Sequence, residues 1–568
     1  MADFPDDWPA LLPTTLQTIQ GGVPGQLYGA LIVLADLVEN TLSDEKFFSV
    51  ARDIVTTIYN IASDQQQKLT LRALAIKIFR ECFEIMDTIK DESEAQAKAF
   101  AEQTLAVWEP LFTSIIKLPL PPRTPEDVAR EPASWREIMS IKIQTIKTLF
   151  RIRSVFPSVL LNIILEVFSA VWADLTSQRE HFQDLYIDND EQGRLEDADG
   201  LPYTLDFLVL EELDFLQSCL TAPPVKQELT TQIQASPNVF TTPFLLHMMQ
   251  LTVALSQITN EDEGLWDIDP SLFLAEEAAV TGNYTARTAC GDFVVKIGEW
   301  LKLDALRALL QATSLSYNEP LSTWKTEEAS MFLLTTIMND FYDTDMELDD
   351  LCGAMVSSLI DRTIGPQNHP LLRARSYLIA GVLVRGQPLR PEAMGLLDQT
   401  IHAITHDESD LVKVACIKAL QYYVEQTTIP ISKEQQIAIC QSISDFLETR
   451  DMSELEDQED LMMALVETLR FAINIDPHIS LNSRVLDLLF LLAKHGGASF
   501  HLAQMVNEAF EEIVEVLSKS GAELYGRLCE KVLPSLIGAF DVGTLTEDMN
   551  LTIVSISASL FQLCTNSS

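Results

Sequence analysis

Carboxylates are the side chains of this sequence whose number and spacing suggest a chemical role. They gather in four short segments, and carboxylates at this density attract a basic protein surface over about 8–10 Å at physiological salt. The alternative is a set of solvated acids that bind nothing, which is the commoner outcome for charge runs. The candidate contact residues are Asp188, Asp190, Glu191, Glu196, Asp197, Asp199, Glu261, Asp262, Glu263, Asp343, Asp345, Glu347, Asp349, Asp350, Glu454, Glu456, Asp457, Glu459 and Asp460.

The first segment, residues 184–200, is long and polar and predicts an acidic loop. Within it, Asp188, Asp190 and Asp199 resemble the first, third and last ligands of a calcium-binding loop. Such a loop requires oxygen ligands at fixed positions, including a final bidentate Glu. Here Gln192 stands at the fifth position and the final ligand is a shorter Asp. We therefore favour an acidic loop without calcium and predict no metal or other cofactor.

His402 and His406 lie four residues apart and would share a helix face. A zinc site needs three or four converging ligands, so we favour an ordinary histidine pair at the end of a helix. The sequence lacks the phosphate-binding, dinucleotide-binding, serine-hydrolase and zinc-protease patterns. The carboxylates are abundant, but none stands alone in an apolar setting that would shift its pKa. We predict that the chain is not an enzyme.

Helices must position these acids, because the helical period is visible along most of the chain. Apolar residues recur at helical spacing from Phe47 to Ala62 and again from Leu71 to Met86, with a polar turn between them. A second pair spans residues 135–150 and 160–175, with Pro157 placed to open the second helix. Residues 117–132, with Pro110 just before them, are rich in proline and predict a loop.

The clearest repeating unit lies in the middle of the chain. One apolar helix contains Leu396 and Ile404, a turn follows at residues 406–410, and a second helix contains the small residues Ala415 and Cys416. This arrangement resembles the HEAT-repeat pattern. Later pairs occupy 460–475 with 484–494 and 502–518 with 524–538. HEAT units are about 40–47 residues long, so about 12–14 would fit here.

We therefore predict an all-α fold, a HEAT-repeat α-solenoid in which antiparallel helical hairpins form one superhelix over residues 1–568. Alternation typical of strands is scarce, so we expect essentially no sheet. Residues 258–288 are expected to form an irregular acidic insert, and residues 339–350 and 451–460 acidic connectors. A chain of 568 residues is too long for one compact core.

Composition narrows the possible partners. The 39 Lys and Arg residues against 83 Asp and Glu residues give a net charge of −44. Such a surface repels nucleic acid and anionic membrane and attracts basic proteins, although it would also simply keep a long array soluble. The eight cysteines form no CxxC pair, and most lie in apolar helical surroundings, which predicts buried thiols in a reducing compartment. No apolar run reaches the length of a membrane span.

Residues 261–277 carry a more specific signal. The order Trp266, Asp269-Pro270, Phe273 and an acid at 276 or 277, followed by Arg287 and Ala289, resembles a signature of the importin-β (karyopherin-β) family. Weaker matches are the Trp8-Pro9 start and the segment from His369 to Arg375. Within that family the pattern is most similar to the importin-nine-like branch, whose members import core histones and the TATA-binding protein.

The resemblance implies a monomeric nuclear import receptor that shuttles between cytoplasm and nucleus. It would bind basic protein cargo on an acidic concave surface, release it under Ran-GTP control, and contact Phe-Gly nucleoporins. In this interpretation Trp266, Asp269, Pro270, Phe273 and Arg287 have structural roles.

Two alternatives share this architecture: an exportin of the same family and a HEAT scaffold outside transport. The resemblance also implies a chain truncated at both ends, with Ran binding incomplete, because family members begin earlier and continue further.

Overall fold

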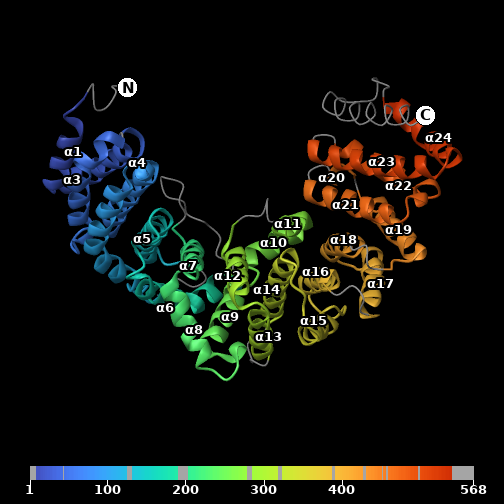
Figure 1. Cartoon of the computed structure of the whole chain (residues 1–568), viewed down its shortest axis with the longest axis horizontal. Helices are drawn as coiled ribbons and strands as arrows, with labels where there is room; N and C mark the ends of the chain where they lie inside the picture. Colours follow the sequence, from blue (N-terminus) through green and yellow to red (C-terminus); the bar gives the residue numbers. More distant parts are fainter. Residues whose placement is uncertain are drawn as a thin grey trace. The chain divides into compact units, whose positions relative to one another are not determined.

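The computed structural model describes residues 8–42, 44–123, 131–189, 203–277, 284–317, 323–386, 391–425, 430–450, 452–455, 458–496 and 499–539. Every regular element in these ranges is a helix, and none of them contains a strand (Figure 1). The all-α prediction is therefore confirmed. The chain divides into two compact units, residues 1–261 with 284–312 and residues 262–283 with 313–568. Within the described ranges, no helix is long and apolar enough to cross a membrane.

The first unit consists of helical hairpins, with α10 and α13 crossing its boundaries. Its helices are α1 (Leu11–Gln20), α2 (Pro24–Asp36), α3 (Asp44–Ser63), α4 (Leu69–Ile116), α5 (Ala133–Val155), α6 (Ile164–Phe182), α7 (Leu205–Cys219), α8 (Pro223–Gln234), α9 (Pro243–Leu255), α10 (Asn260–Ile268), α12 (Ala286–Leu301) and α13 (Leu303–Tyr317). Short π-helical turns follow α2 and α6 at Leu37–Thr41 and Gln183–Ile187, and a 3-10 turn at Val239–Thr241 precedes α9.

Helices α4, α5, α7 and α12 pack against one another in chain order. Polar contacts join neighbours: Arg80 donates to Gln144 across 2.8 Å, and Lys147 donates to Glu211 across 2.8 Å. Because each helix in this layer touches only its neighbours, stacking buries a continuous apolar surface along the unit.

Two sequence expectations need correction in this unit. The helix predicted to end near Met86 continues to Ile116 as one element of 48 residues, and Pro110 lies inside it rather than with the loop. Pro157 does not open a helix, since residues 157–163 form turns and α6 begins at Ile164. Apolar spacing predicted which helix faces are buried. It could not show that one helix continues through residues 69–116 or that a turn extends over residues 157–163.

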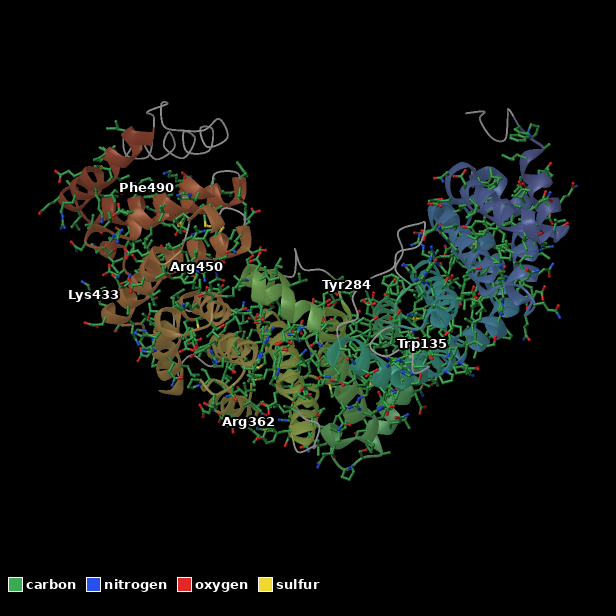
Figure 2. All side chains as sticks on the ribbon, turned by 180° about the vertical axis from the view of Figure 1, so that it is seen from behind. Trp135, Tyr284, Arg362, Lys433, Arg450 and Phe490 are labelled. Atoms are coloured by element: carbon green, nitrogen blue, oxygen red, sulfur yellow. The ribbon has the colours of Figure 1, made fainter. Side chains whose placement is uncertain are left out.

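The proline-rich segment does form a connection, of which residues 124–130 lie outside the described residues. At its start, the indole nitrogen of Trp135 on α5 donates to the carbonyl of Pro121 across 2.7 Å. Trp135 is fully buried (Figure 2). This contact attaches the loop to the first turn of the helix that follows it.

The second unit continues the same architecture. Its helices are α11 (Pro270–Glu277), α14 (Trp324–Asp343), α15 (Asp350–Thr363), α16 (Pro370–Gly386), α17 (Pro391–His406), α18 (Asp410–Glu425), α19 (Lys433–Glu448), α20 (Met452–Leu455), α21 (Glu459–Ile475), α22 (Val485–His495), α23 (Phe500–Ser520) and α24 (Ala522–Ala539), with a 3-10 turn at Pro477–Leu481. Helices α14, α16, α18, α21 and α23 pack in that order. The hairpins predicted around residues 396–420, 460–494 and 502–538 are confirmed.

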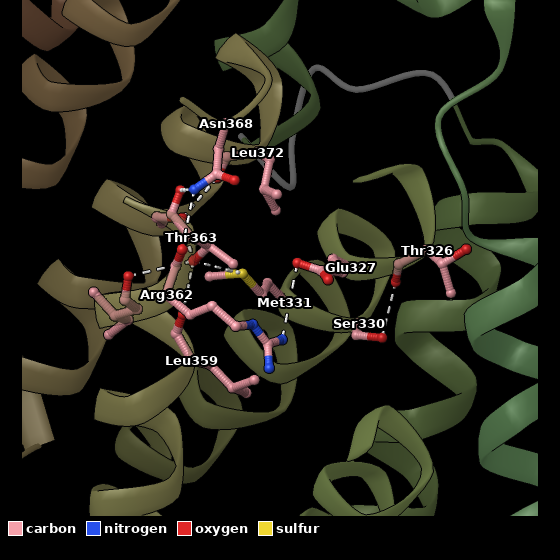
Figure 3. Close-up of polar contacts among 11 residues, drawn as sticks. Thr326, Glu327, Ser330, Met331, Leu359, Arg362, Thr363, Asn368 and Leu372 are labelled. Atoms are coloured by element: carbon pink, nitrogen blue, oxygen red, sulfur yellow. Dashed lines mark hydrogen bonds and ion pairs between the residues drawn. The ribbon is translucent and has the colours of Figure 1, made fainter. Parts of the chain in front are cut away.

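The turn between α15 and α16 shows how the hairpins are joined (Figure 3). The Asn368 amide donates to the carbonyls of Arg362 and Thr363 across 3.0 and 2.9 Å. It thereby satisfies carbonyls that the end of α15 leaves without helical partners. The Thr363 hydroxyl accepts a bond of 2.8 Å from Ser376 of α16, and Pro370 opens that helix.

Candidate functional site

The acidic segment around Trp266 is helical, which corrects the expectation of an irregular insert at residues 258–288. Helices α10 and α11 occupy most of it, and α12 begins at Ala286. Residues 262–277, which belong to the second unit, are called the strap below. Helix α11 packs against α18 and α21, well beyond its neighbours in sequence. The strap therefore connects several successive repeats of its own unit.

Glu263 attaches the strap to the start of α14 and α16. Its carboxylate lies 3.0 Å from the ammonium of Lys325 and 3.6 Å from Nε2 of His369. The His369 ring stacks on Trp324 with centroids 3.7 Å apart. Burial lowers the pKa of His369, and the nearby carboxylate of Glu263 partly opposes this. Glu263 thus has structural partners that the sequence did not reveal.

Asp269 joins the two strap helices and reaches a distant segment. Its carboxylate accepts from the backbone and hydroxyl of Ser271 across 2.9 and 2.7 Å, which caps the start of α11. The same carboxylate oxygen accepts a bond of 3.2 Å from Gln458, which precedes α21. Pro270 occupies the first turn of α11.

The apolar signature residues face the interior of the second unit. Trp266 and Phe273 are buried and meet edge to face, with ring centroids 5.4 Å apart. The guanidinium of Arg375 on α16 lies 5.4 Å from the Phe273 ring. The aromatic residues therefore attach the strap to the repeat helices beneath it.

Arg287 is buried in the first turn of α12 in the first unit. Its guanidinium donates to the carbonyl of Ser256, after α9, across 2.6 Å. Nearby, the hydroxyl of Tyr284 donates to Asp214 of α7 across 2.6 Å. Burial raises the pKa of Asp214 to about 6. These contacts link α7, α9 and α12.

The acids of residues 343–350 span the end of α14, the connector that follows it and the start of α15. Asp343, Asp345, Glu347 and Asp350 are exposed. Asp343 forms an ion pair of 3.0 Å with Arg385. Asp345 has a φ of 57°, a left-handed conformation that Asp tolerates better than most residues. Asp349 instead caps α15 by accepting from the backbone of Cys352 across 2.8 Å, so its role is local and structural.

The other acidic clusters are described only in part. Asp188 is exposed, whereas Asp190, Glu191, Glu196, Asp197 and Asp199 lie outside the described residues, as do Glu456, Asp457 and the side chain of Glu454. Glu459 is exposed and accepts from Ser499 across 2.5 Å. Burial raises the pKa of Asp460, and the negative charge of Glu459 adds to this increase. Glu261 and Asp262 are half-buried on α10.

A charged cluster that sequence reasoning missed lies inside the first unit. The ammonium of Lys142 on α5 lies 2.6 Å from both carboxylate oxygens of Asp174 on α6. Glu212 of α7 is fully buried beside them. Burial, and then the proximity of Asp174, raises the pKa of Glu212 well above its usual range. Helical spacing places these three residues on packed faces. The apolar pattern does not indicate that side chains from three different helices come into contact there.

The remaining chemical candidates lack a site. The rings of His402 and His406 stack with centroids 4.0 Å apart. Across the part of the chain that is described, no three metal-ligating side chains converge. The described cysteines are free thiols, and all but Cys529 are buried. Burial raises the pKa of Cys82 to about 12, which leaves this thiol unreactive.

Comparison with known proteins agrees with this architecture. The family described as "Importin-9 central HEAT repeats" matches residues 239–497. Importin subunit beta-5 of Schizosaccharomyces pombe is 24% identical over 545 residues, which is 94% of this chain and 52% of that protein. Importin subunit beta-5 of Saccharomyces cerevisiae is 20% identical over 565 residues, 95% of this chain and 51% of that protein. The chain spans about half the length of the curated relatives that it matches.

A solved structure shares the fold. The exportin Cse1 in its cargo-free, cytoplasmic state superposes with a TM-score of 0.62 at 15% identity, covering 100% of this chain and 59% of that one. The stacked hairpins thus define an α-solenoid of the HEAT class. Residues 239–497 match an importin family model, and most of the chain is similar to proteins of the importin-β (karyopherin-β) family.

Proposed function

We propose that this chain acts in nuclear import by binding basic protein cargo, with core histones and the TATA-binding protein as candidates. The observation that carries the proposal is the combination of similarity to importin-β family proteins with a net charge of −44. Charge complementarity of this kind accelerates association and rejects acidic competitors. Cargo would be carried through the pore between cytoplasm and nucleus by a monomeric receptor.

Among the predicted contact residues, the exposed acids are the ones available to cargo. Asp343, Asp345, Glu347 and Asp350 form the densest described cluster, and Asp188 and Glu459 are also exposed. Glu263 and Asp349 are only half-exposed and hold the strap and the start of α15, so we assign them structural roles. Asp343 and Glu459 also have intramolecular partners but remain exposed. The acids outside the described residues stay in the proposal as predicted contacts.

Ran and nucleoporins are the further proposed partners. Solved proteins of this fold include a Kap95:Nup1 complex, with a TM-score of 0.52. They also include Kap95p, whose binding induces the switch loops of RanGDP to adopt the GTP-bound conformation, with a TM-score of 0.51. In the first unit, a groove of about 800 Å³ lies between the end of α4 and the face of α6. Its apolar lining, including Pro119, Leu165 and Ala170, suits the Phe side chain of a Phe-Gly nucleoporin.

The test is a binding assay with purified core histones at physiological salt. An unrelated acidic protein of matched charge serves as the first control. The variant with Asp343→Asn, Asp345→Asn, Glu347→Gln and Asp350→Asn is expected to lose about tenfold in affinity, because rim ion pairs contribute about 0.2–1 kcal/mol each. The charge-matched control replaces four exposed helix acids by Gln: Glu102, Glu180, Glu228 and Glu434. Equal losses in both variants, or equal binding by the unrelated protein, would reduce the interaction to net charge alone.

Export is the second candidate, because the fold is shared with the exportin Cse1. The two directions differ in thermodynamic coupling. Ran-GTP weakens cargo binding by an import receptor and strengthens it for an exportin, and the coupling is reciprocal. Measuring histone affinity with and without Ran-GTP separates them. A scaffold outside transport would instead show no affinity for Phe-Gly repeats.

A further inference from the structure

The strap carries apolar residues on two faces, although only one face packs on its own unit. The inner face contains Trp266, Phe273 and Leu274, all of which are buried. Leu265, Ile268 and Leu272 are exposed, to 45%, 84% and 41%. A helix that is apolar on more than one face is usually packed on each of those faces. Within the described residues, the face of Leu265, Ile268 and Leu272 stays exposed.

The three exposed residues form one stripe. Their spacing of three and four residues follows a helical face. The junction between α10 and α11 keeps this spacing, because the backbone N–H of Asp269 donates to the carbonyl of Leu265 across 2.9 Å. The stripe formed by Leu265, Ile268 and Leu272 therefore crosses both helices of the strap.

The strap that presents this stripe is held firmly. Glu263 pairs with Lys325, Asp269 accepts from Gln458, and Phe273 lies against Arg375. These contacts involve residues of the inner face and of the junction between the helices, so the side chains of the stripe remain exposed. A pre-positioned apolar surface loses little conformational entropy when a partner binds.

Charge decides which partner fits. Residues 262–277 contain six acids and no Lys, Arg or His: Asp262, Glu263, Asp267, Asp269, Glu276 and Glu277. Asp267, which is exposed, lies between Leu265 and Ile268 in sequence. An apolar stripe in an acidic frame complements a segment whose apolar face is flanked by basic residues, and it disfavours acidic or anionic partners.

We infer that the stripe of Leu265, Ile268 and Leu272 docks a basic amphipathic segment of the cargo. This inference rests on the proposed function and deepens it, because it gives the cargo an apolar anchor in addition to its charge. Buried apolar anchors near the centre of an interface dominate affinity, whereas rim charges mainly set specificity and association rate.

The probe is a synthetic helical peptide with Leu on one face and Lys and Arg on the other. A scrambled peptide of identical composition, in which the Leu residues share no face, controls for charge. Fluorescence anisotropy is expected to show binding at least tenfold tighter for the amphipathic peptide. The variant Leu265→Ser, Ile268→Ser, Leu272→Ser should abolish that difference. Equal binding of the two peptides, or full binding by the variant, would overturn the inference.

The matched control replaces three exposed apolar residues elsewhere, Val107→Ser, Leu351→Ser and Phe500→Ser, and should retain the difference. Sedimentation velocity tests the competing occupant: a dimer that the stripe variant converts to monomer would assign the stripe to a second copy and overturn the basic partner. Histone binding without any stripe dependence would remove the cargo role of the stripe and leave the proposed function intact. Peptide binding at the stripe without histone binding would contradict histones as the cargo and leave the stripe as a binding site for a basic amphipathic segment.

Discussion

The guanidinium of Arg375 donates from Nε to the carboxylate of Glu328 across 2.9 Å, and neither side chain is exposed (both 0%). The pair joins α16 to α14 within the second unit. Phe332 of α14 and Phe273 of the strap lie 5.1 and 5.4 Å from the guanidinium carbon. One buried cation therefore connects two repeat helices with the strap above them.

Glu328→Ala should destabilise the second unit by about 3–5 kcal/mol, since it leaves the charge of Arg375 buried without this carboxylate. Unfolding of a long repeat array need not be two-state, so hydrogen exchange of α14 and α16 is the suitable measurement. The double variant Glu328→Leu, Arg375→Met should recover most of the loss, because apolar replacement of a whole buried pair is often neutral. Glu448→Ala, at the exposed pair with Arg484, is the control and should change little. Equal protection in Glu328→Ala and Glu448→Ala would contradict the assigned role.

Glu212 predicts a pH dependence of the first unit. Burial raises its folded-state pKa well above the value near 4.5 of a solvated glutamate. The folded chain therefore binds more protons than the unfolded chain between the two pKa values. The stability contribution is full below the unfolded pKa and is lost as pH rises through the folded pKa. Glu212→Gln, which is neutral throughout, should gain in thermal midpoint relative to wild type between about pH 5 and pH 8. A constant difference across that range would show that Glu212 titrates normally.

Asp269 has two separable roles that single substitutions distinguish. Asp269→Ala removes the cap of α11 and the bond from Gln458 together. The free energy of hydrogen-exchange protection in the strap should therefore fall by about 1–2 kcal/mol. Gln458→Ala removes only the bond from α21 and should cost less, about 1 kcal/mol. Identical exchange in the two variants would mean that the cap contributes nothing.

Trp108 is one of the large buried aromatic residues of the first unit. It is fully buried and stacks on Phe79 with centroids 4.0 Å apart. Trp108→Ala should cost about 3–5 kcal/mol, measured by loss of hydrogen-exchange protection in α4. Trp8 is exposed, so Trp8→Ala should stay within about 0.5 kcal/mol. A similar cost at both positions would argue against the packing role.

Much of the fold follows from local pattern. Apolar spacing placed the hairpin of α17 and α18, and the small residues Ala415 and Cys416 lie buried where the helices pack. The same spacing could not show that α4 continues through Pro110, because a proline within a helix and a proline after it look alike in sequence. The order of Trp266, Asp269 and Phe273 resembles the importin-β family and lies within the range that the family model matches. The helical form of this acidic, proline-containing stretch was not visible in the sequence.

The sequence by itself determined the fold class, because helical periodicity requires stacked hairpins, and its excess of acids favours positively charged partners. Tertiary structure decided which acids are exposed. Glu263 and Asp349 are engaged in an ion pair and a helix cap, whereas Asp345 and Asp350 are exposed. It also brought Asp269 to Gln458, 189 residues away. Side-chain spacing records which face of a helix is buried, but a contact between distant helices depends on how the repeats pack, and that is settled only when the chain folds.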